Sequence, residues 1–221
     1  MNLYNIIIDN GIYIILGCSY LSLYYPLLSF YIYLKSFSAN YYLCFSKFYS
    51  NPSLYKWKHL IRLTDTGHYA NFLFYFYPEY LPISHNILFV ITFAYYVTKC
   101  FFNMKDTDDR YNKEIISSLQ IIHCEINHTV PYIIMFYHNT QSNYTFDNNT
   151  LLYSYIWVYI WLLFIWTPWT LITGDPVYSI LDRDSPFTIK FIVAVIVHFM
   201  IYFANMLGRY SNYCFNPHPT S

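Results

Sequence analysis

Four polar side chains lie in the middle of one long apolar stretch of this sequence. The stretch runs from Ile115 to His138 and carries His123, Glu125, Asn127 and His128. The hydrocarbon core of a bilayer is about 30 Å thick and is crossed by a helix of about 20 residues, so these groups would sit near mid-depth. Ionisable groups at that depth are costly and usually functional. The stretch therefore raises the question of which chemistry they support.

Metal binding has little support from the spacing of the candidate ligands. His123 and His128 are five residues apart, about 140° round a helix, so they cannot easily bind one metal ion. Cys124 and His128 have helical ligand spacing, but two ligands do not make a site. We predict no metal and no cofactor, and we expect polar residues here to be satisfied by hydrogen bonds between helices.

Glu125 suggests a different use of the same stretch. A buried carboxylate is strongly disfavoured, so we expect Glu125 to be protonated or paired with an imidazole, with His198 and Asn205 as candidate partners. Glu125 and the histidines could also form a proton relay in a transporter or channel. The sequence shows no paired half-helices or inverted repeats, which makes this the weaker interpretation.

Thr64 is the candidate nucleophile. It lies in the polar segment LTDTGH, where Thr64 or Asp65 could simply cap the helix that follows. If that helix begins a few residues earlier, Thr64 lies roughly 7 Å inside the membrane, and His123 and His128 lie roughly 12 Å and 20 Å inside from the same face. A hydroxyl beside an imidazole can act as a nucleophile with a general base. Depth favours His123 as the partner of Thr64.

The composition predicts the kind of secondary structure that carries these residues. Hydrophobic residues make up 56% of the 221 and charged residues only 11%, against about 25% charged in soluble domains. The sequence predicts an all-α, polytopic transmembrane helix bundle that forms a single domain over residues 1–221. It has about six spans, at residues 11–34, 59–78, 81–102, 115–138, 151–172 and 188–207.

The charges predict the orientation of this bundle. With the N-terminus outside, the three inner loops hold five, four and two of the twelve basic residues, and only Arg209 falls outside. Two glycosylation sequons, at Asn143 and Asn148, fall in a loop that this scheme also places outside. The basic residues form no stripe along a helix, so we predict no nucleic-acid binding. Five scattered cysteines predict reduced thiols rather than a disulfide framework.

Several short motifs, in order, resemble those of a known family. They are Trp57-Lys58 followed by Leu63-Thr64, a histidine in mid-span before Thr129-Val130-Pro131, and Gly174 leading to Val177-Tyr178 and Leu181-Asp182. Over about residues 57–190 the chain resembles the androgen-induced family and the related rolling stone proteins. The LTNWG, H-x-x-N and IYPVLDW motifs of the latter are echoed by LTDTG, HCEIN and VYSILDRDSP. Ser179 stands where the family usually has proline.

The resemblance implies a multipass membrane protein and, in some members, an intramembrane threonine hydrolase that acts on fatty-acid esters. Thr64 matches the threonine of the family's Leu-Thr pair. His128 precedes Thr-Val-Pro in the family manner, with a shorter spacing to the proline, whereas His123 resembles the H-x-x-N form with one extra residue before Asn127, so the general base stays open between them. The partners would be membrane lipids and a lipid-ester substrate, in the endoplasmic reticulum or the plasma membrane. The alternative is a non-catalytic membrane protein of rolling stone type, with a structural or interaction role.

Overall fold

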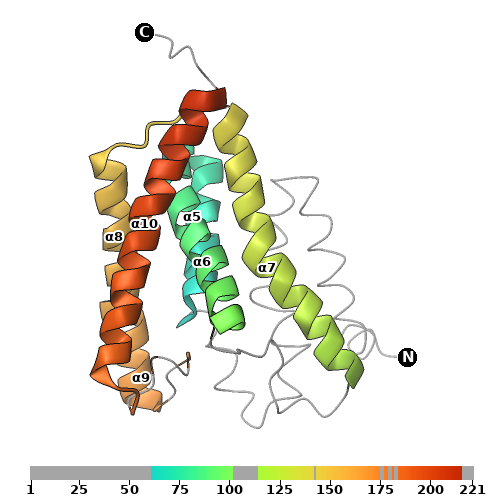
Figure 1. Ribbon diagram of the computed structural model, residues 1–221, viewed down its shortest axis with the longest axis vertical. Helices are drawn as coiled ribbons and strands as arrows, with labels where there is room; N and C mark the ends of the chain where they lie inside the picture. Colours follow the sequence, from blue (N-terminus) through green and yellow to red (C-terminus); the bar gives the residue numbers. More distant parts are fainter. Residues whose placement is uncertain are drawn as a thin grey trace. The chain divides into compact units, whose positions relative to one another are not determined.

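The computed structural model describes residues 61–101, 114–141, 143–174, 177–178, 181 and 184–215. These residues are helical with short connections and contain no strand, as the sequence predicts. The helices are α5 (Leu63–Phe76), η3 (Pro78–Tyr80), α6 (Leu81–Phe101), α7 (Glu114–Gln141), α8 (Asn148–Ile160), η4 (Trp161–Trp166), α9 (Thr167–Thr173) and α10 (Phe187–Phe215) (Figure 1). The predicted span at 11–34 lies outside the described residues.

The chain divides into two compact units. The first combines Met1–His59 with Val97–Val130, and the second combines Leu60–Tyr96 with Pro131–Ser221. In the described residues the first unit therefore holds the last turn of α6 and the larger part of α7. The second unit holds α5, the body of α6, the last third of α7 and all of α8 to α10.

Among the residues that the structure describes, three helical stretches are long and apolar enough to cross a membrane. They are Pro78–Phe101, Asn148–Thr173 and Phe187–Phe215, and they correspond to the predicted spans at 81–102, 151–172 and 188–207. α5 has 14 residues, fewer than the roughly 20 that a crossing needs, so the predicted span at 59–78 is found as a shorter helix. α7 is a helix of 28 residues that covers the predicted span at 115–138.

Local chemistry explains where these helices begin and end. α5 stops at Tyr77, directly before Pro78, because the residue before a proline is forced out of the helical region. Asp147 caps α8 by accepting the Thr150 backbone N–H at 2.7 Å. α9 ends at Gly174, whose φ of 72° is the left-handed conformation typical of a helix C-terminus.

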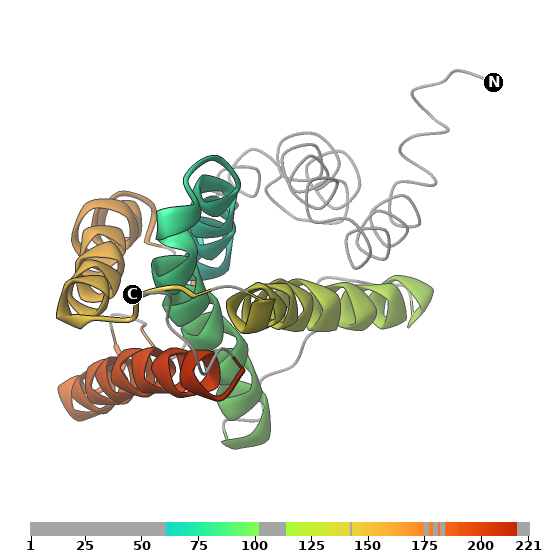
Figure 2. The same cartoon turned by 90° about the horizontal axis from the view of Figure 1, so that it is seen from above.

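The share of buried residues differs greatly among these three membrane-length stretches. In the most apolar stretch of each, 61% of residues are buried in Pro78–Phe101, but only 6% in Asn148–Thr173 and 17% in Phe187–Phe215. From above, α6 lies between α5 and α10 (Figure 2). α8 and α10 run side by side. α6 is thus the core helix of the second unit, while α8, α9 and α10 keep an open apolar face.

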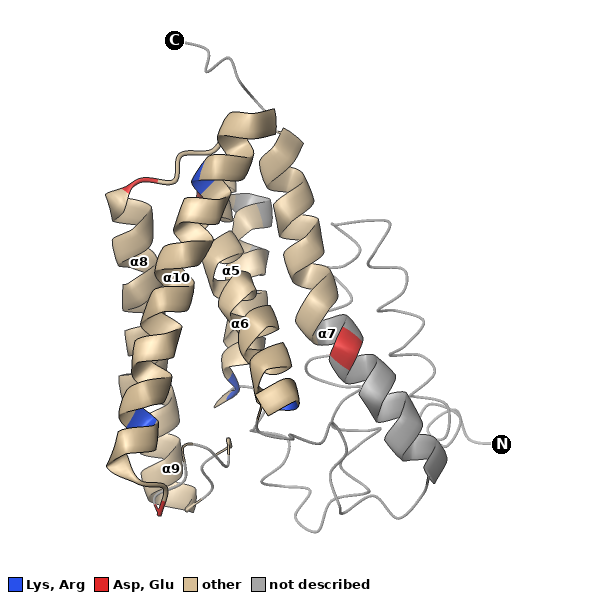
Figure 3. Cartoon of the chain, in the orientation of Figure 1, with Lys and Arg blue, Asp and Glu red and all other residues tan. Residues whose placement is uncertain are grey.

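The described charges avoid that open face. Asp147 precedes α8, and Lys190 and Arg209 lie toward the two ends of α10, so the ribbons of α8 and α10 are uncharged over their central turns (Figure 3). The side chains that the open face presents are large and apolar, for example Phe164 at 74% exposure and Leu171 at 80%. Apolar groups outside and polar groups inside are the reverse of a soluble protein.

Candidate functional site

Thr64 lies in the first turn of α5, and its side chain is half-buried. The N-cap of this helix is Arg62, which makes no capping bond with its side chain. The interpretation of Thr64 as a helix cap is therefore wrong, because the helix starts one residue before it. The start of α5 is held instead by side chains from distant parts of the second unit.

Two aromatic side chains hold this helix start, and we call them the clamp. The Tyr178 hydroxyl accepts the Leu63 backbone N–H at 3.0 Å, and the Trp161 indole N–H donates to the Ile61 carbonyl at 2.6 Å. The rings of Trp161 and Tyr178 meet edge to face, with centroids 6.3 Å apart. The first N–H groups of a helix have no partner within it, so the clamp satisfies one of these groups beside Thr64.

Both clamp residues lie on unusual backbone. Trp161 begins a π-helical segment, Trp161–Trp166, within the long helix from Asn148 to Thr173. Val177, next to Tyr178, has a φ of 64°, which is a true outlier for a β-branched side chain. Such segments and such strain gather at functional sites. Beside Thr64, the described residues thus combine a π-helical segment with a strained residue.

The predicted general bases belong to the other unit. His123 and His128 both lie on the part of α7 that ends at Val130, whereas Thr64 belongs to the second unit. The His128 side chain is half-buried, and that of His123 is outside the described set. The pairing of Thr64 with either imidazole therefore stays a prediction.

Glu125 is paired with the ammonium group of a lysine. Lys99, in the last turn of α6, makes an ion pair and hydrogen bond with the Glu125 carboxylate within the first unit. Both side chains are about one-third exposed, 32% and 34%. The expected partner Asn205 is engaged elsewhere, and His198 stacks on Tyr155 with ring centroids 4.0 Å apart. Lysine is the ordinary partner of a carboxylate, but Lys99 is 26 positions away in the sequence, so no local pattern pointed to it.

A buried polar network crosses the second unit. Asn86 on α6 donates through its amide nitrogen to the Ser154 hydroxyl on α8 at 3.0 Å and to the Asn205 amide oxygen on α10 at 3.1 Å. His85, beside it, is 0% exposed and lies 3.3 Å from the Asn86 amide oxygen. Tyr132 of α7 lies 3.5 Å from the other ring nitrogen of His85. We call these five residues the core network.

The directions of these bonds fix the tautomer of His85. The amide oxygen of Asn86 can only accept, so a neutral His85 donates to it through Nδ1–H. Nε2 then carries the lone pair and accepts from the Tyr132 hydroxyl. Further along, Ser154 donates to the Thr150 carbonyl at 2.8 Å and Asn205 to the Asp147 carbonyl at 3.4 Å. Every bond in the core network thus has a defined donor and acceptor.

This network is suited to holding helices together rather than to moving protons. The side-chain amide of Asn86 is a donor and an acceptor but does not titrate in the ordinary range, so a proton passed from Tyr132 to His85 would stop there. In the described ranges, no group of three or more His, Cys, Asp or Glu side chains could hold a metal ion. The core network was not among the predicted sites, although the triplet Ser84-His85-Asn86 inside an otherwise apolar span was a usable signal for it.

The chain was compared with protein-family models, with curated proteins and with solved structures, and nothing in any of the three groups matches it.

Proposed function

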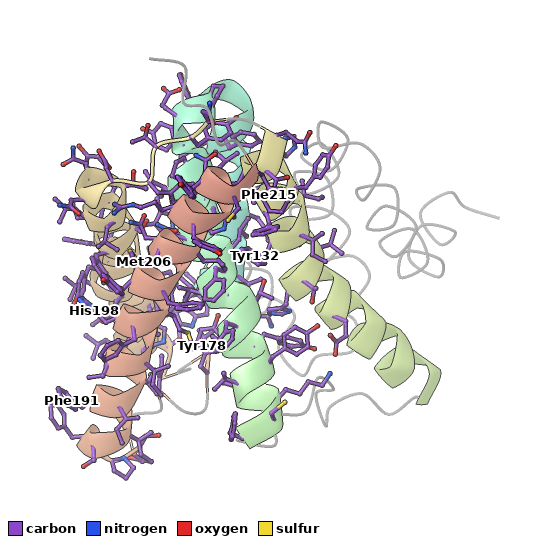
Figure 4. All side chains as sticks on the ribbon, turned by 45° about the horizontal axis from the view of Figure 1, so that its top comes forward. Tyr132, Tyr178, Phe191, His198, Met206 and Phe215 are labelled. Atoms are coloured by element: carbon purple, nitrogen blue, oxygen red, sulfur yellow. The ribbon has the colours of Figure 1, made fainter. Side chains whose placement is uncertain are left out.

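We propose that this chain is a multipass integral membrane protein with about six spans, whose buried polar residues serve mainly to assemble its helices. The observation that carries the proposal is the inverted distribution of polarity in the second unit. His85, Asn86 and Ser154 are each 0% exposed, while α10 projects large apolar side chains such as Phe191 away from the other helices (Figure 4). Lipid can cover such a surface at no cost, whereas water cannot.

Extraction of membranes from expressing cells tests the membrane part of this proposal. Peripheral proteins leave the membrane in alkaline carbonate, whereas a protein held by spanning helices remains in the pellet and dissolves only in detergent. We expect complete retention in the pellet. Release into the carbonate supernatant, with a known spanning protein retained in the same sample, would contradict the proposal.

We propose hydrolysis of a lipid ester as the second candidate function, because one contact favours it. Leu63-Thr64 and Val177-Tyr178 are two of the motifs behind the family resemblance, and the bond from Leu63 N–H to the Tyr178 hydroxyl joins them across 115 positions of sequence. In this reaction the Thr64 hydroxyl attacks the ester carbonyl, and His123 or His128 takes its proton and returns it to the leaving alcohol. Water then cleaves the Thr64 ester and releases the fatty acid.

Labelling with a fluorophosphonate probe tests this second candidate. The purified protein should be labelled, Thr64→Ala should lose the label, and Thr64→Ser should keep it. Thr66→Ser is the matched control, because the buried Thr66 hydroxyl already donates to the Leu63 carbonyl at 2.8 Å. Equal labelling of wild type and Thr64→Ala would remove Thr64 as the nucleophile and leave the non-catalytic proposal standing.

A further inference from the structure

The connection between α7 and α8 is an extended strap, residues 143–147, whose backbone is held by side chains. Four consecutive carbonyls of the strap each accept a hydrogen bond from a side chain. Asn212 donates to Tyr144, Arg209 to Phe146 and Asn205 to Asp147 at 3.4 Å. The Thr150 hydroxyl lies 3.2 Å from the Thr145 carbonyl and shares its one hydrogen between this carbonyl and the Asp147 carboxylate at 2.9 Å. Irregular backbone at the edge of a membrane is tolerated where protein satisfies it in this way.

Arg209 makes the strongest of these attachments. Its Nε and Nη2 both donate to the Phe146 carbonyl, at 2.9 Å and 2.7 Å. Hydrogen bonds from a charged donor are shorter and stronger than neutral ones. The same side chain is exposed toward the surroundings, so its charge stays solvated while its two N–H groups fix the strap.

The strap inserts one aromatic ring into the second unit. Phe146 is 4% exposed, and a Cβ at Gly208 of α10 would overlap its ring, so the glycine provides the space for the ring. On its other side the ring meets His85 edge to face, with centroids 5.2 Å apart. Tyr132 and Phe136 complete the aromatic surroundings of the imidazole, at centroid distances of 5.3 Å and 6.3 Å.

We propose that the strap is a seal, in which Phe146 closes the core network against the aqueous phase at this end of the unit and Arg209 is its latch. His85 lies in the second turn of α6, roughly 6 Å from the helix start at 1.5 Å per residue. At that depth an open strap would admit water to the imidazole. The closed strap keeps the Nε2 lone pair of His85 for the Tyr132 hydroxyl.

Thiol accessibility tests the seal. In protein lacking its five native cysteines, His85→Cys should react slowly with a cationic, membrane-impermeant methanethiosulfonate. Adding Arg209→Gln, which loses the charged donor, should speed the reaction about tenfold or more. Arg209→Lys, which can place one donor but not two, should fall between them. Asn148→Cys, at an exposed position beside the strap, should react quickly in every background and serves as the control.

A second measurement keeps His85 in place. Diethyl pyrocarbonate carbethoxylates the native imidazole, and peptide mass spectrometry measures the rate. The rate should rise from wild type to Arg209→Lys to Arg209→Gln, and Phe146→Ala should give the largest rise. Rapid reaction at position 85 with the strap intact would overturn the seal. So would rates that Arg209→Gln and Phe146→Ala both leave unchanged in folded protein.

Discussion

At the scale of single residues, the structure concentrates its polar interactions in Asn86. The amide of Asn86 donates hydrogen bonds to Ser154 on α8 and to Asn205 on α10, and it accepts one from its neighbour His85. Three side chains therefore depend on it. Hydrogen bonds between helices in membranes are individually modest, at about 0.6 kcal/mol on average. Asn86 makes two of them, to α8 and to α10, and its partners are buried, so it should nevertheless have a measurable effect on stability.

Asn86→Ala should lower the free energy of unfolding by about 1–2 kcal/mol, because it leaves the amide of Asn205 and the hydroxyl of Ser154 short of a partner. Thermal unfolding of the purified protein in detergent measures the loss as a lower midpoint. Asn149→Ala, at an exposed position, is the control and should leave the midpoint unchanged. A midpoint equal to wild type for Asn86→Ala would show that the core network contributes little to stability.

Val177, the strained residue beside the clamp, is a position where a substitution should raise the stability of the protein. Val177 has a φ of 64°, a conformation that costs an L-residue about 1 kcal/mol or more and costs glycine almost nothing. Val177→Gly should therefore raise the thermal midpoint, whereas Val177→Ala, which keeps a Cβ, should not. If both variants unfold at the wild-type midpoint, Val177 is not strained in the folded protein.

At the scale of elements, Asp147 makes the start of α8 sensitive to pH. The backbone N–H and the side-chain hydroxyl of Thr150 both donate to its carboxylate, and these bonds hold the pKa of Asp147 below its ordinary value. A lowered pKa means that the folded state favours the ionised form. The stabilisation is therefore complete above the ordinary pKa of about 4 and is lost as the pH falls through the folded-state value.

Asp147→Asn should remove this pH dependence, since an amide still caps the helix but does not titrate. Thermal midpoints at pH 7 and pH 3 should differ less in Asp147→Asn than in wild type, and Asp147→Ala should be less stable than wild type at pH 7 by about 1 kcal/mol. The side chain is partly exposed, so solvent screening keeps the charge effect small. An unchanged difference between the two pH values in Asp147→Asn would assign the pH dependence to another group.

Element positions were largely predictable, because long apolar runs bounded by polar residues and prolines define membrane helices well. The helices ending at Phe101 and Thr173 follow the predicted spans within a few residues, and the last helix begins at Phe187 as predicted but continues to Phe215, eight residues past its predicted end. The partners of polar side chains were not predictable. Whether Glu125 meets Lys99 or an imidazole, and whether Asn205 meets Asn86, depends on the packing of helices that the sequence pattern does not specify.

At the scale of the whole molecule, we propose that the chain crosses the membrane several times and that the strap and the loop before α10 lie on opposite sides of it. The contacts of the second unit agree with alternating helices. Phe146 of the strap packs on His85 at the start of α6 and on Gly208 toward the end of α10. Trp161 and Tyr178 meet the start of α5. The strap precedes Asn148 and Tyr178 follows Thr173, so these two lie beyond opposite ends of the helix from Asn148 to Thr173.

The most direct test places single cysteines in a cysteine-free chain, at Asn143 in the strap and at Ser185 before α10, and treats intact cells with an impermeant maleimide. We expect Asn143→Cys to be labelled in intact cells and Ser185→Cys to be labelled only after the membrane is permeabilised, because an odd number of crossings separates them. If both cysteines are labelled in intact cells, the two sites share one side of the membrane and the proposed topology is wrong. If neither is labelled until permeabilisation, the same two variants are treated in sealed microsomes, where Ser185→Cys alone should react. Labelling of both or of neither there contradicts the topology.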